Sequence, residues 1–180
     1  MTNPTLLGLS GSLRADATNR KLLREAARLY GPCTYVEGDL NFPLYDGDDE
    51  AATGVPDAVK AVVAQITQAD GILISTPEYN KGPSGVLKNA LDWISRVPGQ
   101  AMRDKPTVVM SASAGRAGGE RAQSVLRAFL VSFQPRILQG PEVHLAASSE
   151  QFDDNGHLTG ELYVTTLTDL MARLRTEIAR

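Results

Sequence analysis

A chain of 180 residues is long enough for one sizeable core, and its 42% hydrophobic and 22% charged residues exclude a disordered or fibrous protein. A formal net charge of −3 excludes the broad basic surface that nucleic-acid binding needs, and no apolar run approaches the roughly 18 residues of a membrane span. One cysteine, Cys33, cannot form an internal disulfide, and the first residues carry no secretory pattern. We therefore expect a cytoplasmic protein without nucleic-acid or membrane partners.

Apolar runs and helical periodicity alternate along the first half of the chain. Thr5–Ser10 predicts a strand, and apolar residues then recur every three or four positions up to Gly31, as on one face of a helix. Thr34–Glu37 predicts a weaker second strand. Residues 39–54, which include several acidic residues and are interrupted by Gly and Pro, predict a polar loop. A second helix is predicted to begin at Pro56, a residue that the first helical turn tolerates.

The second half continues the alternation. Gly71–Ser75 is a short apolar run typical of a strand buried on both faces, and a helix that ends near Val97 is predicted after the loop that follows it. Pro106–Ser111 predicts a fourth strand, which leads into a Gly-rich loop and another helix. Residues 136–148 predict a fifth strand interrupted at its Gly-Pro pair, and a terminal helix follows an Asn-Gly turn.

Five strands that alternate with helices favour an α/β fold with three layers, α/β/α, in which helices cover both faces of a parallel sheet. The flavodoxin-like strand order 2-1-3-4-5 is the simplest doubly wound order that brings the loops after the first, third and fourth strands to one crevice. We expect residues 1–180 to form a single domain of this kind.

The loop after the first strand, GSLRADATN, has the composition of an anion site. Ser10, Ser12, Arg14, Thr18 and Asn19 surround the predicted start of a helix, where backbone N–H groups and the helix dipole favour a negative charge. Neither GxxxxGK[ST] nor GxGxxG is present, which argues against a P-loop or a standard dinucleotide site. The alternative is that Thr18 or Asn19 only caps the helix and that Arg14 is solvated.

The loop after the third strand carries Pro77, Glu78, Tyr79 and Asn80 in succession. An aromatic face suits stacking on a flat ring, and an amide supplies both a donor and an acceptor. These residues therefore predict a ligand-binding loop. The alternative is a plain turn in which Tyr79 packs and Asn80 adopts a positive φ.

Together these motifs resemble the NAD(P)H-dependent FMN reductases, a flavodoxin-like family that includes quinone, chromate and azo-dye reductases. The chain contains G-S-x-R with a downstream Asn, P-E-Y-N followed by L-K-N-A-L-D-W, and a Ser- and Gly-rich loop after the fourth predicted strand. The resemblance spans nearly the whole chain. It implies an FMN cofactor, NADPH or NADH as co-substrate, and a small-molecule electron acceptor.

The resemblance also assigns residues by position. Those that would hold the FMN phosphate are Ser10, Ser12, Arg14 and Asn19, with Thr18 in place of a hydroxyl that is lost at Ala17. The isoalloxazine ring would lie between Pro77, Glu78, Tyr79 and Asn80 on one side and Ser113, Gly115 and Gly118 on the other. A second departure from the family pattern is Pro83, which stands one position early before the L-K-N-A segment and alters the expected path of that loop.

If FMN is bound, the flavin carries the chemistry and the chain needs no catalytic acid or nucleophile. Electrons would pass from the nicotinamide through FMN to a quinone, flavin, azo compound or metal ion in a ping-pong sequence. His144 and His157 lack metal-ligand spacing, so no metal site is expected. The alternatives are a flavodoxin-type electron carrier and a flavin-binding sensor, which turn over no small substrate. Arg14 and the modest net charge favour the reductase.

The resemblance further implies a homodimer or homotetramer, because the family usually completes its flavin cleft with a neighbouring chain. The apolar arc of the helix that includes Val86, Leu91 and Trp93 is wider than one sheet face requires, which agrees with a subunit interface. A helix that is deeply buried in its own chain is the alternative.

Overall fold

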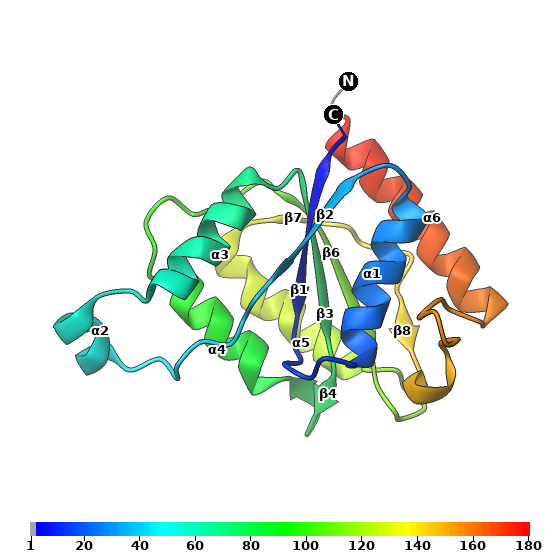
Figure 1. The fold of residues 1–180 in the computed structure, drawn as a ribbon, viewed down its shortest axis with the longest axis horizontal. Helices are drawn as coiled ribbons and strands as arrows, with labels where there is room; N and C mark the ends of the chain where they lie inside the picture. Colours follow the sequence, from blue (N-terminus) through cyan, green and yellow to red (C-terminus); the bar gives the residue numbers. More distant parts are fainter. Residues whose placement is uncertain (1–2) are drawn as a thin grey trace.

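The computed structural model describes residues 3–180 and contains a parallel sheet between two layers of helices (Figure 1). The strands of this sheet are β1 (Thr5–Ser10), β2 (Thr34–Gly38), β3 (Gly71–Thr76), β6 (Pro106–Ala112), β7 (Arg136–Ile137) and β8 (His144–Leu145). The fifth position of the sheet is shared by the two short strands β7 and β8, which pair with the beginning and the end of β6. The sheet order β2-β1-β3-β6-β7 is the predicted flavodoxin-like order, since β6 is the fourth main strand.

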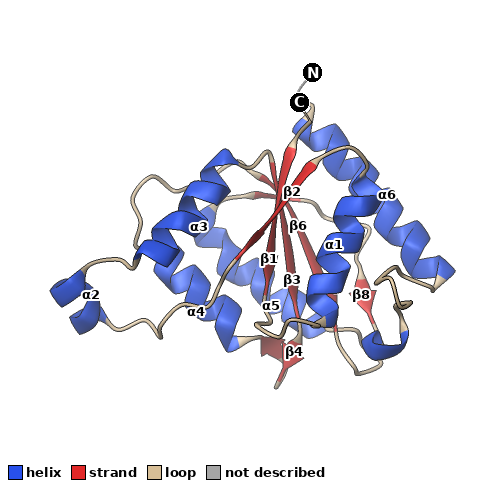
Figure 2. Cartoon of the chain, in the orientation of Figure 1, coloured by secondary structure: helices blue, strands red, loops and turns tan. Residues whose placement is uncertain are grey.

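Helices cover both faces of the sheet, as Figure 2 shows. One layer contains α1 (Thr18–Tyr30) and α6 (Glu161–Ile178). The other contains α3 (Asp57–Gln68), α4 (Gly85–Ile94) and α5 (Glu120–Leu130). Short 3-10 turns lie at Val131–Phe133 and Ser148–Glu150. No helix within residues 3–180 combines the length and the apolar character that a membrane span needs.

Each central strand is buried on both faces because its successive side chains enter different cores. Leu7, Ile72 and Val109 pack with α3, α4 and α5, whereas Leu6 and Leu73 pack with α1 and α6. All six residues of β3 are buried. This arrangement explains why these strands appear in the sequence as continuous apolar runs rather than as alternating patterns.

The segment 39–54 differs from the predicted polar loop, because it contains a short helix, α2 (Gly47–Thr53). The Asp46 side chain accepts a hydrogen bond from Asp48 N at 2.8 Å, and three acidic residues lie in the first turn, so local capping and the dipole stabilise this helix. None of its residues is buried, and it therefore has no apolar periodicity that could have revealed it. Pro56, expected in the first turn of the next helix, is instead the residue before it.

The apolar arc of α4 is covered within the chain. Leu87, Leu91 and Trp93 are buried against α3 and the strands. At the edge of the arc, Trp93 Nε1 and Asn89 Nδ2 both donate to the carbonyl oxygen of Pro43, at 2.8 and 2.9 Å. The width of the arc thus follows from packing inside one chain, so it does not require a subunit interface.

The single cysteine lies half-buried after α1. The Cys33 thiol donates to the carbonyl oxygen of Ala27 at 3.7 Å, and burial raises the pKa of this thiol. A raised pKa reduces the fraction of reactive thiolate at neutral pH. Its half-buried thiol therefore favours a role for Cys33 as a small hydrophobic residue rather than as a nucleophile.

Candidate functional site

A cavity of about 480 Å³ opens at the carboxyl ends of β1, β3 and β6. The loops that leave these strands meet at the lower edge of the sheet in Figure 1. Eight of the residues singled out in the sequence line the cavity: Ser12, Arg14, Thr18, Asn19, Pro77, Glu78, Tyr79 and Ser113. Four others, Ser10, Asn80, Gly115 and Gly118, lie in the same loops but outside the lining.

The amino-terminal end of α1 faces the cavity without a cap. Its N-cap residue is Ala17, which has no side-chain acceptor, and the N–H groups of Thr18 and Asn19 donate no hydrogen bond within residues 3–180. Arg14 is exposed and forms no ion pair within the same residues. Open N–H groups, the positive end of the helix dipole and an unpaired guanidinium together make a site for a phosphate-like anion.

Asn19 fixes this helix end over the sheet. Its side chain is buried, and Oδ1 accepts from Ser75 Oγ at 2.7 Å and from Ala112 N at 3.0 Å. Its Nδ2 donates to the Ala112 carbonyl oxygen at 2.9 Å. The amide therefore joins α1 to β3 and β6, and most of its hydrogen-bonding capacity is used inside the protein.

The loop after β1 is closely packed against the loop after β3. Ser12 N donates to Ser10 Oγ at 3.2 Å, which places Ser10 beneath the loop rather than in the cavity. A Cβ atom at Gly11 would come within 2.9 Å of both Ser84 Oγ and Thr76 Oγ1. Glycine is therefore the residue that permits the two loops to touch.

The P-E-Y-N segment forms a small hairpin, β4 (Glu78–Tyr79) and β5 (Gly82–Pro83). The two residues between the strands, Asn80 and Lys81, have φ values of 51° and 72°, as a type I′ turn requires. Asn80 therefore occupies the turn itself, while Tyr79 lies at the mouth of the cavity with 57% of its surface exposed.

Pro83, which stands one position early relative to the family pattern, has a defined place in the loop before α4. Pro83 ends the hairpin, and the buried Ser84 is the N-cap of α4, where its Oγ accepts from Leu87 N at 3.2 Å. The same hydroxyl donates to the Gly11 carbonyl oxygen at 2.6 Å. Ser84 thus ties the start of α4 to the loop after β1.

The loop after β6 presents Ser113 to the cavity, whereas Gly115 is exposed at its tip. Gly118 lies against β8, with a φ of 60°, and a Cβ atom there would collide with the His144 carbonyl group. Ser111 Oγ donates to the Gly118 carbonyl oxygen at 2.6 Å, and the buried Gln123 amide donates to Ser111 Oγ at 2.9 Å. Gly118 therefore supports the loop by packing closely against β8 and does not line the cavity.

The structure adds lining residues that the sequence analysis missed. The hydroxyl groups of Thr18 and Ser148 lie 3.1 Å apart, so the segment after the fifth strand position closes one side of the cavity. The available signal was the pair Ser148 and Ser149, the last residue of the last predicted strand and the residue directly after it. The added residues are Asp16, Ala17, Lys21, Ala112, Ala114, Ser148 and Ser149.

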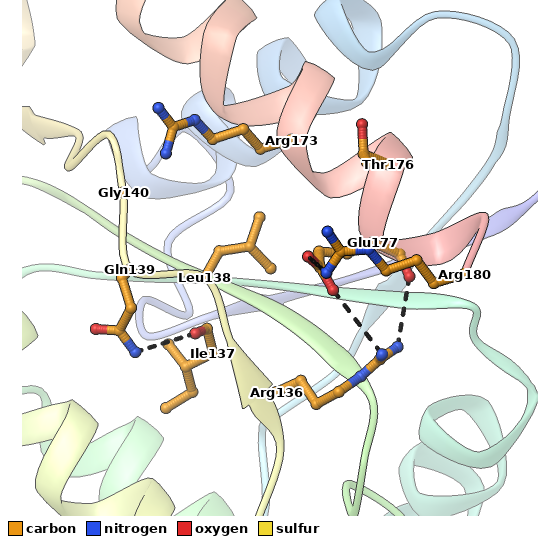
Figure 3. Close-up of a pocket in the computed structure, with 9 residues that line it drawn as sticks. All are labelled: Arg136, Ile137, Leu138, Gln139, Gly140, Arg173, Thr176, Glu177 and Arg180. Atoms are coloured by element: carbon orange, nitrogen blue, oxygen red, sulfur yellow. Dashed lines mark hydrogen bonds and ion pairs between the residues drawn. The ribbon is translucent and has the colours of Figure 1, made fainter.

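A second pocket, of about 440 Å³, lies beside the carboxyl-terminal end of α6 (Figure 3). Arg136, Arg173 and Arg180 line it. Arg136 donates to the carbonyl oxygens of Asp104 at 2.9 Å and Glu177 at 3.4 Å, and Arg180 donates to the Glu177 carboxylate at 2.6 Å. Two of its three guanidinium groups are therefore bound to acceptors of the chain itself.

The protein has a flavodoxin-like α/β fold with a cavity at its switch point. The sequence model of the NADPH-dependent FMN reductase family matches residues 4–150. The chain is 44% identical over 155 residues to an NAD(P)H-dependent FMN reductase of Pseudomonas aeruginosa, with 85% of this chain and 83% of that protein covered. It is 38% identical over 168 residues to a quinone reductase of Escherichia coli, with 86% and 89% covered. The chain belongs to the NADPH-dependent FMN reductase family.

Solved structures share the fold. The flavoenzyme NAD(P)H:(acceptor) oxidoreductase FerB of Paracoccus denitrificans superimposes with a TM-score of 0.87 at 29% identity, over 98% of this chain and 97% of that one. An azoreductase of Bacillus anthracis shares the fold with a TM-score of 0.63 at 18% identity, over the full length of both chains.

Proposed function

We propose that the protein is an FMN-containing oxidoreductase that oxidises NADH or NADPH and reduces a quinone, a flavin, an azo compound or a metal ion. The observation that carries this proposal is the uncapped amino-terminal end of α1 beside the unpaired Arg14, in a chain of the FMN reductase family. The whole of residues 1–180 would serve as one FMN-binding domain. The cytoplasmic location stays a prediction.

The cavity residues fit an FMN molecule. The phosphate would be held by Ser12, Arg14 and Thr18 with the open N–H groups of α1, while Asn19 holds the helix end in place. Pro77, Tyr79 and Ser113 also line the cavity and would contact the ring system. When bound, FMN supplies two-electron chemistry with a reduced nicotinamide and then with an acceptor.

The chain itself contributes binding and access. The hairpin that carries Tyr79 and the loop from Ser113 to Gly119 bound one opening, so nicotinamide and acceptor have to use it in turn. A shared opening favours a ping-pong sequence, and initial rates varied in both substrates should give parallel double-reciprocal lines. Intersecting lines would mean that both substrates occupy the site together and would contradict this part of the proposal.

A homodimer or homotetramer is part of the proposal. Tyr79 at the cavity mouth is 57% exposed, and Leu13, in the loop between the lining residues Ser12 and Arg14, is 44% exposed; a neighbouring chain would cover these apolar side chains. Light scattering at micromolar protein concentration should therefore report at least a dimer. A monomer under these conditions would contradict the proposed oligomer and would mean that one chain forms the whole cavity.

The decisive experiment is the absorption spectrum of the purified protein before and after anaerobic addition of NADH or NADPH. The expected result is a flavin spectrum that bleaches on addition of one or both nucleotides and returns with a quinone. A flavin spectrum that neither nucleotide bleaches would instead support the electron carrier or the sensor. A protein that neither contains nor binds flavin would overturn the proposal.

A further inference from the structure

Helix α5 begins at a residue that cannot cap it. Its N-cap is Gly119, with a φ of 93°, and a Cβ atom at this position would lie 2.7 Å from Cβ and Oγ of Ser111. No serine, threonine or aspartate side chain fits there. The N–H groups of the first turn therefore need an acceptor from another part of the chain.

Glu78, which lies 43 residues before Arg121, supplies this acceptor. Its Oε2 accepts from Arg121 N at 3.1 Å and from Ala122 N at 3.3 Å. These are the second and third residues of α5, which are the positions that an N-cap side chain normally serves. The negative charge also faces the positive end of the helix dipole.

This contact joins the hairpin, which lines the cavity, to a helix that does not line it but continues the loop whose Ser113 and Ala114 do. Glu78 belongs to the hairpin after β3, whereas α5 follows the loop that presents Ser113. The far side of α5 is already fixed, because the buried Gln123 amide donates to Ser111 Oγ at 2.9 Å and to the Val143 carbonyl oxygen at 2.8 Å. The hairpin has no such anchor to α5 apart from the Glu78 carboxylate among the side-chain hydrogen bonds of residues 3–180.

We propose that Glu78 is a positioning residue that latches the hairpin to the start of α5 and so sets the separation between the hairpin and the loop that presents Ser113. The latch is a property of the protein without any ligand. Its effect on FMN binding rests on the proposed function. A cavity of fixed width would favour a flat ring and would lower the entropy cost of ordering the protein around it.

Two conservative variants separate the latch from a role of the charge alone. Glu78→Gln keeps the length and one carbonyl acceptor but removes the charge, whereas Glu78→Asp keeps the charge and withdraws the acceptor by one methylene group. Glu120→Ala is the matched control, because it removes an exposed carboxylate from the same helix end without a side-chain contact to the capped N–H groups. Glu78→Ala removes both the side-chain acceptor and the charge.

The first measurement is amide hydrogen exchange at Arg121 and Ala122 in the flavin-free protein. Loss of an N-cap should speed exchange by about five- to thirtyfold in Glu78→Ala and Glu78→Asp, while Glu78→Gln and Glu120→Ala stay within about twofold of the parent chain. Unchanged exchange in Glu78→Asp, or fast exchange in Glu78→Gln, would overturn the latch. Because Gln and Asp are mild changes, the result does not depend on whether the alanine variant folds.

The second measurement is FMN titration of the same four variants, followed through flavin fluorescence and the visible absorption bands. Affinity should fall severalfold in Glu78→Asp and be restored in Glu78→Gln. The opposite order would assign Glu78 a charge contact with the ligand and overturn the positioning role. If the parent chain binds no flavin, the proposed function fails, and the exchange rates alone decide whether the latch exists.

Discussion

The two ends of the sheet carry pockets of similar volume, about 480 and 440 Å³, and both contain arginine. They differ in the helix end that faces them. The pocket at the carboxyl edge meets the open N–H groups of α1, whereas the other meets the carbonyl groups that end α6, where Arg136 already donates to Glu177. An arginine-lined pocket at a helix amino terminus is therefore suited to an anion, whereas arginine side chains at a helix carboxyl terminus stabilise the helix end.

Loss of the Asn19 amide should produce the largest effect, because this group holds the helix end that distinguishes the two pockets. Asn19→Ala would remove the hydrogen bonds of its amide to Ser75 Oγ and to the N–H and carbonyl groups of Ala112, so we expect the free energy of unfolding to fall by about 3 kcal/mol. Urea denaturation measures the change. The exposed Asn41→Ala is the control, and equal stability of the two variants would show that α1 is held by packing alone.

The next effect concerns affinity and tests the comparison directly. Arg14→Ala should weaken FMN binding by roughly ten- to a hundredfold, since a charge-assisted hydrogen bond contributes about 1.5–3 kcal/mol. Arg173→Ala removes an exposed arginine from the other pocket and should leave the dissociation constant unchanged. Fluorescence titration of the flavin-free proteins decides the matter, and equal losses in both variants would mean that arginine acts only through overall charge.

The smallest effect is expected at the other end of the molecule. Arg136→Ala removes donors from the carboxyl end of α6. It should lower the free energy of unfolding, measured by thermal denaturation, by less than about 1 kcal/mol, because the side chain is partly exposed to solvent. FMN affinity should not change. A marked loss of flavin binding in this variant would contradict the assignment of the second pocket to helix stabilisation.

Most of the fold could be predicted because its strands are continuous apolar runs and its long helices bury one periodic face. Helix α2 could not, since it buries no residue and depends on local capping by Asp46. The rule for parallel sheets correctly predicted that the loops after β1, β3 and β6 meet, and they line one cavity, but the hydrogen-bond partners within these loops could not be predicted. Ser148 lies in the segment after the fifth strand position of the sheet. The roles of Asn19 and Glu78 depend on hydrogen-bond partners distant in sequence, which local patterns do not encode.

The division of the fifth strand position limits what can add to that edge of the sheet. An open edge is a template for strands of other chains, and proteins commonly protect it by keeping edge strands short. β7 and β8 contribute two residues each, and the residues 138–143 between them belong to no strand. A foreign strand would therefore find no continuous row of donors and acceptors here, which protects the protein against strand-mediated aggregation.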